Sequence, residues 1–118
     1  MNITGEMKWH LGEGDYANLK FSESKTSMSV DIVMVPVAHR KKGIGAMLIK
    51  RVLILADLMG KDCYVSARPL GNYSDEKLEG LVRYYERMGF KIIDRGLTTA
   101  YMVRKAVELF DTGQCIQR

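Results

Sequence analysis

The sequence has few of the residues that build disulfide frameworks and metal sites. Among its 118 residues there are only two cysteines and two histidines. Cys63 and Cys115 stand far apart and lack the spacing of metal ligands, so we expect two free thiols and no metal site. Cys63 lies within an apolar strand pattern, which favours core packing over a nucleophilic role. His10 and His39 also lack a second ligand at metal spacing, and we interpret both as non-catalytic.

Long hydrophobic runs are absent as well. No apolar stretch approaches the roughly 20 residues that span a bilayer, and the first residues lack the charged-then-apolar order of a signal peptide. We therefore expect a cytoplasmic protein with no membrane contact. With 47% hydrophobic residues, the chain is predicted to form one domain, residues 1–118, with its core at about 16–105. The tail, 106–118, fits a short helix, a strand extension or an arm that contacts a partner.

The charge balance is mildly basic, with 18 Lys and Arg against 14 Asp and Glu and a formal net charge of +4. Five basic residues crowd one region of the sequence: Arg40, Lys41, Lys42, Lys50 and Arg51. They lack the interleaved aromatic residues of a base-stacking platform, and no recognised nucleic-acid motif accompanies them. Binding of nucleic acid there would be nonspecific, so nucleic acid is the weakest of the partner predictions.

The periodicity of apolar residues predicts a mixed α/β order. Strands are expected near 16–23 and 27–35, after a weakly alternating segment 1–14 that ends in a glycine-rich turn. Helical spacing begins after Gly43 and stops at Gly60, and a second helix is capped by Ser74 and ends at Gly89. Further strands are expected at 61–67, 90–94 and 99–104. The order β-β-β-α-β-α-β-β predicts an α/β sandwich with a mixed sheet.

The segment from Val33 to Ala46 is the most informative part of the chain. An apolar strand runs through the basic turn Arg40-Lys41-Lys42-Gly43 into a helix. Such a turn directs backbone N–H groups outward, and the following helix adds the positive end of its dipole. An ordinary solvated loop is the alternative interpretation. If the turn is an anion-binding site, its expected occupant is a phosphorylated ligand.

Two motifs together favour a specific cofactor. The turn is neither a Gly-x-x-x-x-Gly-Lys-Ser/Thr loop nor Gly-x-Gly-x-x-Gly, but Arg40-Lys41-Lys42-Gly43-Ile44-Gly45 matches Arg/Gln-x-x-Gly-x-Gly/Ala. This resembles the acetyl-coenzyme A site of the GNAT superfamily of N-acetyltransferases. Tyr85-Glu86-Arg87-Met88-Gly89-Phe90 resembles the Tyr-Glu-x-x-Gly-Phe element of the same superfamily. The resemblance covers roughly residues 28–105.

The resemblance implies a GNAT-like mixed, mostly antiparallel sheet flanked by two main helices, with acetyl-CoA as cosubstrate. In that family the strand before the turn is bulged and splayed from its neighbour, and its free backbone groups pair with the pantetheine arm. Many relatives carry an asparagine where this chain has Leu78, and Asn72 is a conceivable replacement. The implied cofactor-binding residues are Val33, Val35, Arg40, Lys41, Lys42, Gly43, Ile44, Gly45, Ala46 and Asn72.

The chemistry implied by the resemblance needs a proton acceptor and a proton donor. Asp31, on the strand that leads to the turn, is the best-placed acid to take the proton of the amine, directly or through water. The alternative is an aspartate that only faces solvent. Tyr85 is expected to protonate the departing thiolate, with Tyr84 as the substitute. Tyr85 also falls on the apolar stripe of its helix, so packing is the alternative role.

Residues 1–27 are too few to hold the strand and two helices that wall the acceptor site in typical GNAT members. The acceptor cleft is therefore expected to be open, or completed by a second subunit of a homodimer or by a partner. Three functions remain open: an N-acetyltransferase acting on a protein, peptide or small amine, a degenerate module that binds coenzyme A or a protein without turnover, and a small basic nucleic-acid-binding protein. Intact Arg40, Gly43, Gly45 and Tyr85 favour the first over the second.

Overall fold

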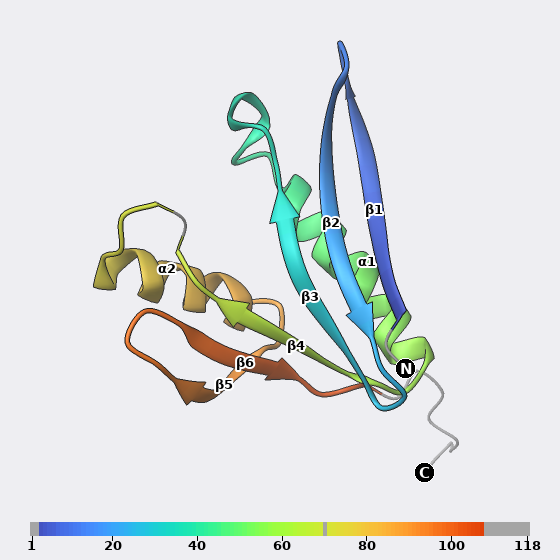
Figure 1. Ribbon diagram of the computed structural model, residues 1–118, viewed down its shortest axis with the longest axis vertical. Coiled ribbons are helices and arrows are strands. Elements are labelled where there is room, and N and C mark those ends of the chain that lie inside the picture. The colour runs from blue at the N-terminus through green and yellow to red at the C-terminus, as the bar shows by residue number, and fades with distance from the viewer. Residues whose placement is uncertain (1–2, 70, 108–118) are drawn as a thin grey trace.

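The computed structural model describes residues 3–69 and 71–107 (Figure 1). The elements follow the predicted order, which confirms a GNAT-like mixed, mostly antiparallel sheet with two helices. The strands and helices are β1 (Ile3–Gly12), β2 (Asp15–Glu23), β3 (Ser27–Met34), α1 (Ile44–Leu58), β4 (Asp62–Ala67), α2 (Asp75–Glu86), β5 (Lys91–Arg95) and β6 (Ala100–Arg104), with a short 3₁₀ turn at Val37–His39.

The six strands form one sheet in the order β1-β2-β3-β4-β6-β5. Only β3 and β4 run parallel, and every other neighbouring pair is antiparallel. β1 pairs with β2 from Ile3 onward, so the sheet begins before the expected core boundary at residue 16. Cys115 and residues 108–118 of the tail lie outside the described part of the chain. Within the described part, neither helix has the length and apolarity needed to cross a bilayer.

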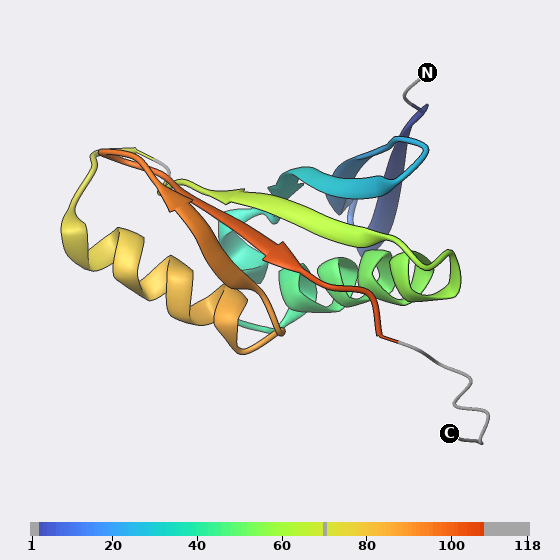
Figure 2. The same ribbon diagram turned by 90° about the horizontal axis from the view of Figure 1, so that it is seen from below.

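Both helices lie against the same face of the sheet (Figure 2). Cys63, Val65 and Ala67 of β4 are buried beneath them, whereas Tyr64 and Ser66 on the opposite face are exposed. The two crossovers advance in the same direction along the sheet, and the usual right hand of such connections puts both helices on one side. The other face, which carries residues such as Ser29, Tyr64 and Tyr101, is covered by neither of the two described helices, and we call it the uncovered face.

Local signals explain where the helices begin and end. Gly43 precedes α1 with a left-handed φ of 79°, which glycine adopts without strain. α1 buries five apolar side chains against the sheet: Leu48, Ile49, Val52, Leu53 and Ala56. The Ser74 hydroxyl accepts a hydrogen bond from the backbone N–H of Lys77 at 3.1 Å, so the predicted cap of α2 is confirmed. Gly89, with φ of 98°, follows the end of α2 as predicted.

Cys63 is a buried free cysteine. Burial raises the pKa of its thiol to about 11, so the sulfur stays protonated and is a poor nucleophile at neutral pH. Its place in the core confirms the packing role expected from the strand pattern.

An ion pair joins the end of α1 to the end of β6. The two Arg104 guanidinium nitrogens donate to the two Asp57 carboxylate oxygens at 2.8 and 3.0 Å. The hydrogen bond from Arg104 holds the pKa of Asp57 below its ordinary value, against the opposing effect of desolvation. A group whose pKa is lowered by folding stabilises the fold above its unfolded pKa. That contribution is lost as pH falls through the lowered value.

We therefore expect Asp57→Asn to lower the free energy of unfolding by about 2 kcal/mol at pH 7. Urea denaturation at pH 7 and pH 3 measures this difference, which should shrink at pH 3 because the Asp57 carboxyl of the unfolded wild-type chain is then largely protonated and folding must release that proton. Lys105→Ala is the matched control, since Lys105 pairs with Asp62 at 3.1 Å but its side chain is 76% exposed. An equal loss in both variants, or a loss at pH 3 as large as at pH 7, would contradict the assignment.

Candidate active site

The sheet splits between β3 and β4. These strands pair only from Ser27 to Val30, where Val30 lies opposite Val65. On its other side β3 carries a bulge, because Phe21 faces Val30 while Lys20 faces Ile32, which leaves Asp31 as the extra residue. The bulged and splayed strand that the family resemblance implied is confirmed. Residues 31–35 thus present a backbone edge that β4 does not pair.

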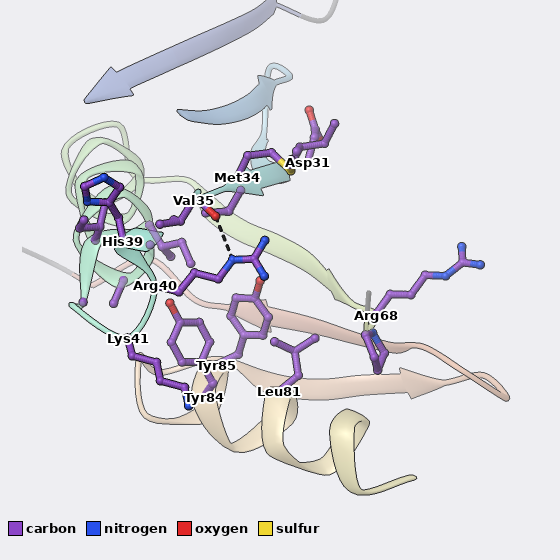
Figure 3. Close-up of a pocket in the computed structure, with 18 of the residues that line it drawn as sticks. Asp31, Met34, Val35, His39, Arg40, Lys41, Arg68, Leu81, Tyr84 and Tyr85 are labelled. Carbon is purple, nitrogen blue, oxygen red and sulfur yellow. Dashed lines mark hydrogen bonds between the residues drawn. The ribbon is translucent and has the colours of Figure 1, made fainter. Parts of the chain in front are cut away.

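A cavity of about 950 Å³ occupies this split (Figure 3). It extends from the end of β3 to the first turn of α1, the end of β4 and one face of α2. Ten of the predicted site residues line it: Asp31, Val33, Val35, Arg40, Lys41, Gly43, Ile44, Gly45, Ala46 and Tyr85. Residues distant in sequence are thereby brought to one site.

Two predicted cofactor residues are not among those that line the cavity. Lys42 is exposed and outside the lining, although both of its neighbours in the turn contribute to it. Asn72 lies in the exposed loop before α2, where its carbonyl accepts a hydrogen bond from Lys77 Nζ at 3.0 Å. Gly71 lines the cavity in its place. The geometry therefore gives no support to cofactor contacts from Lys42 or Asn72.

The N-terminus of α1 has free hydrogen-bond donors. The first backbone bond of the helix runs from the Met47 N–H to the Gly43 carbonyl, at 3.0 Å, and no side chain caps the end. The N–H groups of residues 44–46 therefore have no acceptor within the helix. Lys41 and Gly43 both take left-handed φ angles, of 65° and 79°, and these turn the chain sharply into the helix. Free donors and the helix dipole together provide the geometry that the predicted anion site requires.

Gly45 lies in α1, close to Tyr84 of α2 and Val33 of β3. A Cβ atom built on Gly45 would lie 3.4 Å from the Tyr84 hydroxyl oxygen and 3.7 Å from methyl groups of Val33 and Val35. These are ordinary contacts, so the backbone tolerates an alanine there. A longer side chain must instead extend into the cavity, which explains the narrow choice of glycine or alanine in the motif.

Arg40 turns back onto the strand that precedes it. Its Nε donates to the Val35 carbonyl at 2.9 Å, as the dashed line in Figure 3 shows. Val35 was expected to offer its backbone to pantetheine, but this carbonyl is already engaged. The hydrogen bond instead holds the turn against the end of β3, and the rest of the Arg40 guanidinium stays at the cavity.

Two tyrosines of α2 point into the cavity with their hydroxyl groups toward Arg40 and the end of β3 (Figure 3). Tyr85 is only 8% exposed and makes edge-to-face contacts with Tyr84 and Phe90, at ring distances of 5.3 and 5.5 Å. Burial raises the pKa of Tyr85 to about 12 and also raises the pKa of half-buried Tyr84. Both phenols therefore keep their protons at neutral pH. Tyr85 packs in the core, which confirms the packing role, and it also lines the cavity, so its role as proton donor to the thiolate stays a prediction.

Asp31 lies at the other end of the cavity from Lys41 (Figure 3). It is exposed, and its two carboxylate oxygens accept hydrogen bonds from the hydroxyls of Ser22 and Ser29. Arg40 and Lys41 lie at the α1 end of the cavity, Asp31 is the one carboxylate among the described lining residues, and Arg68 lines the cavity after β4. The cations at the α1 end suit an anionic ligand.

His39 also lines the cavity, although its sequence context predicts a non-catalytic residue. Its Nε2 lies 3.4 Å from a carboxylate oxygen of Asp15, so it joins the start of β2 to the basic turn. The feature of the sequence that could have identified His39 as a lining residue is its position directly before Arg40 of the motif. Its partner is 24 residues away in sequence, and only the fold brings the two together.

No protein-family model matches the sequence, and no curated protein sequence matches it either. Solved structures are similar. The anti-CRISPR protein AcrVA5 is 24% identical over 82% of this chain and 97% of its own, with a TM-score of 0.60. An acyl-CoA N-acyltransferase from Pseudomonas aeruginosa is 23% identical over 86% of this chain and 68% of its own, with a TM-score of 0.66.

A third similar structure is the PaiA N-acetyltransferase from Thermoplasma acidophilum, described in complex with coenzyme A. It is 15% identical over 80% of this chain and 57% of its own, with a TM-score of 0.62. At these identities the similarity establishes the architecture alone. Together with the split between β3 and β4, it shows that this chain has the fold of the GNAT N-acetyltransferases.

Proposed function

We propose that the protein transfers an acetyl group from acetyl-CoA to a primary amine. The observation that carries this proposal is the cavity in the split sheet, which joins an unpaired strand edge to the free N-terminus of α1. The similar PaiA structure, which holds coenzyme A, supports the choice of ligand. Acetyl-CoA fits the residues present, because it combines a diphosphate with an amide-bearing arm.

The N–H groups of Ile44, Gly45 and Ala46 hold the diphosphate, and Lys41 adds a full positive charge beside them. Charge-assisted hydrogen bonds contribute about 1.5–3 kcal/mol each, so a few are sufficient for micromolar affinity. The unpaired edge of residues 31–35 offers backbone groups to the amides of the pantetheine arm. Because the Val35 carbonyl is engaged by Arg40, Val33 is the more suitable backbone partner.

The bound thioester supplies an electrophilic carbonyl and a thiolate leaving group. Asp31 takes a proton from the acceptor ammonium, directly or through water, and leaves a neutral amine. The amine nitrogen then bonds to the carbonyl carbon and gives its second proton to solvent, and the C–S bond breaks. Tyr85 donates its phenolic proton to the departing sulfur and recovers a proton from solvent. Its raised pKa keeps that proton available at neutral pH.

A module that binds coenzyme A without turnover is the second candidate. The observation that favours it is the Arg40 hydrogen bond to the Val35 carbonyl, which removes one expected pantetheine contact. Calorimetric titration with acetyl-CoA, followed by mass spectrometry of candidate amines, separates the possibilities. We expect micromolar binding and an acetylated product. Binding without any product would support the module, and absence of binding would contradict both candidates.

Asp31→Asn tests the proposed base. We expect turnover to fall most near neutral pH and to recover partly at higher pH, where the amine loses its proton without help. Acetyl-CoA affinity should change little, because Asp31 lies at the opposite end of the cavity from the anion site. The measurement is a pH–rate profile, with Asp94→Asn on β5 as the matched control at an exposed carboxylate outside the cavity lining. A profile parallel to wild type would assign Asp31 to structure.

A further inference from the structure

One edge of the sheet is a long strand with a free side. Among the described residues β1, ten residues long, pairs only with β2. Figure 1 shows it as the outermost strand on its side of the sheet. The backbone N–H and C=O groups of β1 that point away from β2 therefore lack a partner in the described part of the chain. A free row of such groups is a template for pairing with another strand.

The usual features that protect an edge strand are sparse in β1. Proteins block such edges with proline, with bulges, with short strands or with many charged side chains. β1 contains no proline, its register with β2 shifts only at its end, and Glu6 and Lys8 are its one acidic residue and its one lysine. β5, at the opposite edge, has half the length, three charged residues among five and a register shift in its middle. β1 is therefore the edge that more readily accepts a strand.

The two faces of β1 carry different side chains. Met7 lies opposite Leu19 of β2, which is fully buried, so Met7 and every second residue from it face the helices. Two residues of this row, Ile3 and Trp9, are still 61% and 39% exposed. The residues of the other row are exposed on the uncovered face: Thr4, Glu6, Lys8 and His10. β1 thus brings an apolar row and a polar, charged row to the free edge.

Two copies of β1 complement each other in an antiparallel pair. Side chains directly opposite one another in such a pair share a face, and a two-fold axis makes every contact occur twice. With the axis at Met7, Glu6 lies opposite Lys8 of the second copy. On the helix side, Ile3 then lies opposite Leu11 of the second copy. The charged row and the apolar row are therefore matched by the same register.

An aromatic contact adds to this register. Gly5 lies opposite Trp9 of the second copy, and the Phe21 ring of β2 already covers Gly5, because a Cβ atom built there would be only 2.5 Å from the ring. The Arg51 guanidinium carbon on α1 lies 4.9 Å from the centre of the Trp9 ring and holds the indole beside the edge. The register therefore brings the exposed indole of each copy next to a phenyl ring of the other.

Charge selects this register over its neighbours. Moving the two-fold axis by one residue places Glu6 opposite Glu6 of the second copy, or Lys8 opposite Lys8 of the second copy. Like charges directly opposite each other are destabilising. Of these three positions of the axis, only the one at Met7 pairs opposite charges.

We propose that the protein forms a homodimer in which two β1 strands pair antiparallel about Met7 and join the two sheets into one. Each strand supplies the backbone partners that the free edge of the other lacks. The apolar row of one edge then covers the same row of the other. This dimer goes beyond the proposed function and does not depend on it, since no residue of β1 is among the described residues that line the cavity.

Sedimentation equilibrium tests whether the dimer exists. We expect the mass to rise from that of a monomer, 13.4 kDa, to twice this value as the protein concentration increases over roughly 1–100 μM. A mass that stays at the monomer value over this range would overturn the proposal. Assembly beyond two copies would also contradict it, because a two-fold contact closes with the dimer.

Charge reversal tests the register. Glu6→Lys and Lys8→Glu each place like charges opposite one another, so we expect each variant alone to dimerise roughly 10-fold more weakly than wild type. An equal mixture of the two variants restores both opposite-charge pairs, and we expect it to dimerise as wild type does. The mixture also controls for changes within one copy, such as loss of the hydrogen bond that Asn18 donates to Glu6.

Lys91→Glu on β5 is the matched control, because it reverses an exposed charge at the other edge of the sheet. Thermal denaturation checks that every variant is folded. Acetyl-CoA affinity should be equal in all of them, and its absence from the wild-type protein would bear on the proposed function alone. A dimer unaffected by both reversals, equal weakening by Lys91→Glu, or a mixture no stronger than its components would rule out pairing through β1 in this register.

Discussion

Gly45→Glu is expected to abolish acetyl-CoA binding while the protein stays folded. The Cβ atom fits, because its nearest neighbours are the Tyr84 hydroxyl at 3.4 Å and methyl groups at 3.7 Å. The remaining side chain must enter the cavity, where its carboxylate reaches the free N–H groups of the first turn of α1. A negative charge at a helix N-terminus stabilises the helix. The introduced carboxylate would therefore occupy the anion site and repel the diphosphate of acetyl-CoA.

Calorimetric titration measures the effect, and we expect an affinity at least 100-fold below wild type with an unchanged or slightly higher melting temperature. Two further substitutions at this position separate the effect of side-chain size from the effect of negative charge. Gly45→Ala should bind nearly as well as wild type, and Gly45→Gln reports the cost of bulk without charge. A folded Gly45→Glu protein with wild-type affinity would disprove the phosphate site and leave an ordinary loop.

Tyr85→Phe is expected to reduce kcat roughly 100-fold, within the usual contribution of one general acid. The ring keeps its contacts with Tyr84 and Phe90, so the change removes only the hydroxyl. That hydroxyl acts on the sulfur as it leaves, and its effect belongs to the transition state rather than to cofactor binding. Acetyl-CoA affinity should therefore be unchanged.

Stability gives a second, independent readout for the same variant. Among residues 3–69 and 71–107, no group forms a hydrogen bond with the Tyr85 hydroxyl. Removing a buried hydroxyl without a partner relieves its desolvation cost, so the melting temperature should stay equal or rise slightly. A purely structural tyrosine predicts normal turnover, so kcat distinguishes the two roles and the melting temperature checks that the fold is intact. The matched variant is Tyr84→Phe, and loss of kcat in that variant alone would transfer the role to Tyr84.

Local sequence patterns were sufficient to place the strands and helices. The spacing after Gly43 predicted α1, and Ser74 predicted the start of α2, because caps and apolar periodicity act over a few residues. The anion site could also be predicted from the sequence, because the backbone donors expected to bind the ligand belong to one contiguous segment from Arg40 to Ala46. Position within the motif was thus enough to identify six of the residues that line the cavity, and ten of its twenty lining residues were predicted from the sequence.

Long-range packing decided the rest. Asn72 lies in the loop before α2 and Lys42 in the turn before α1, and neither of them is among the residues that line the cavity. The contacts of His39 with Asp15 and of Asp57 with Arg104 join segments that no local pattern relates. The uncovered face likewise results from the position of both helices on the same side of the sheet. That position depends on the handedness of two crossovers and on burial across the whole sheet, which are properties of the assembled fold.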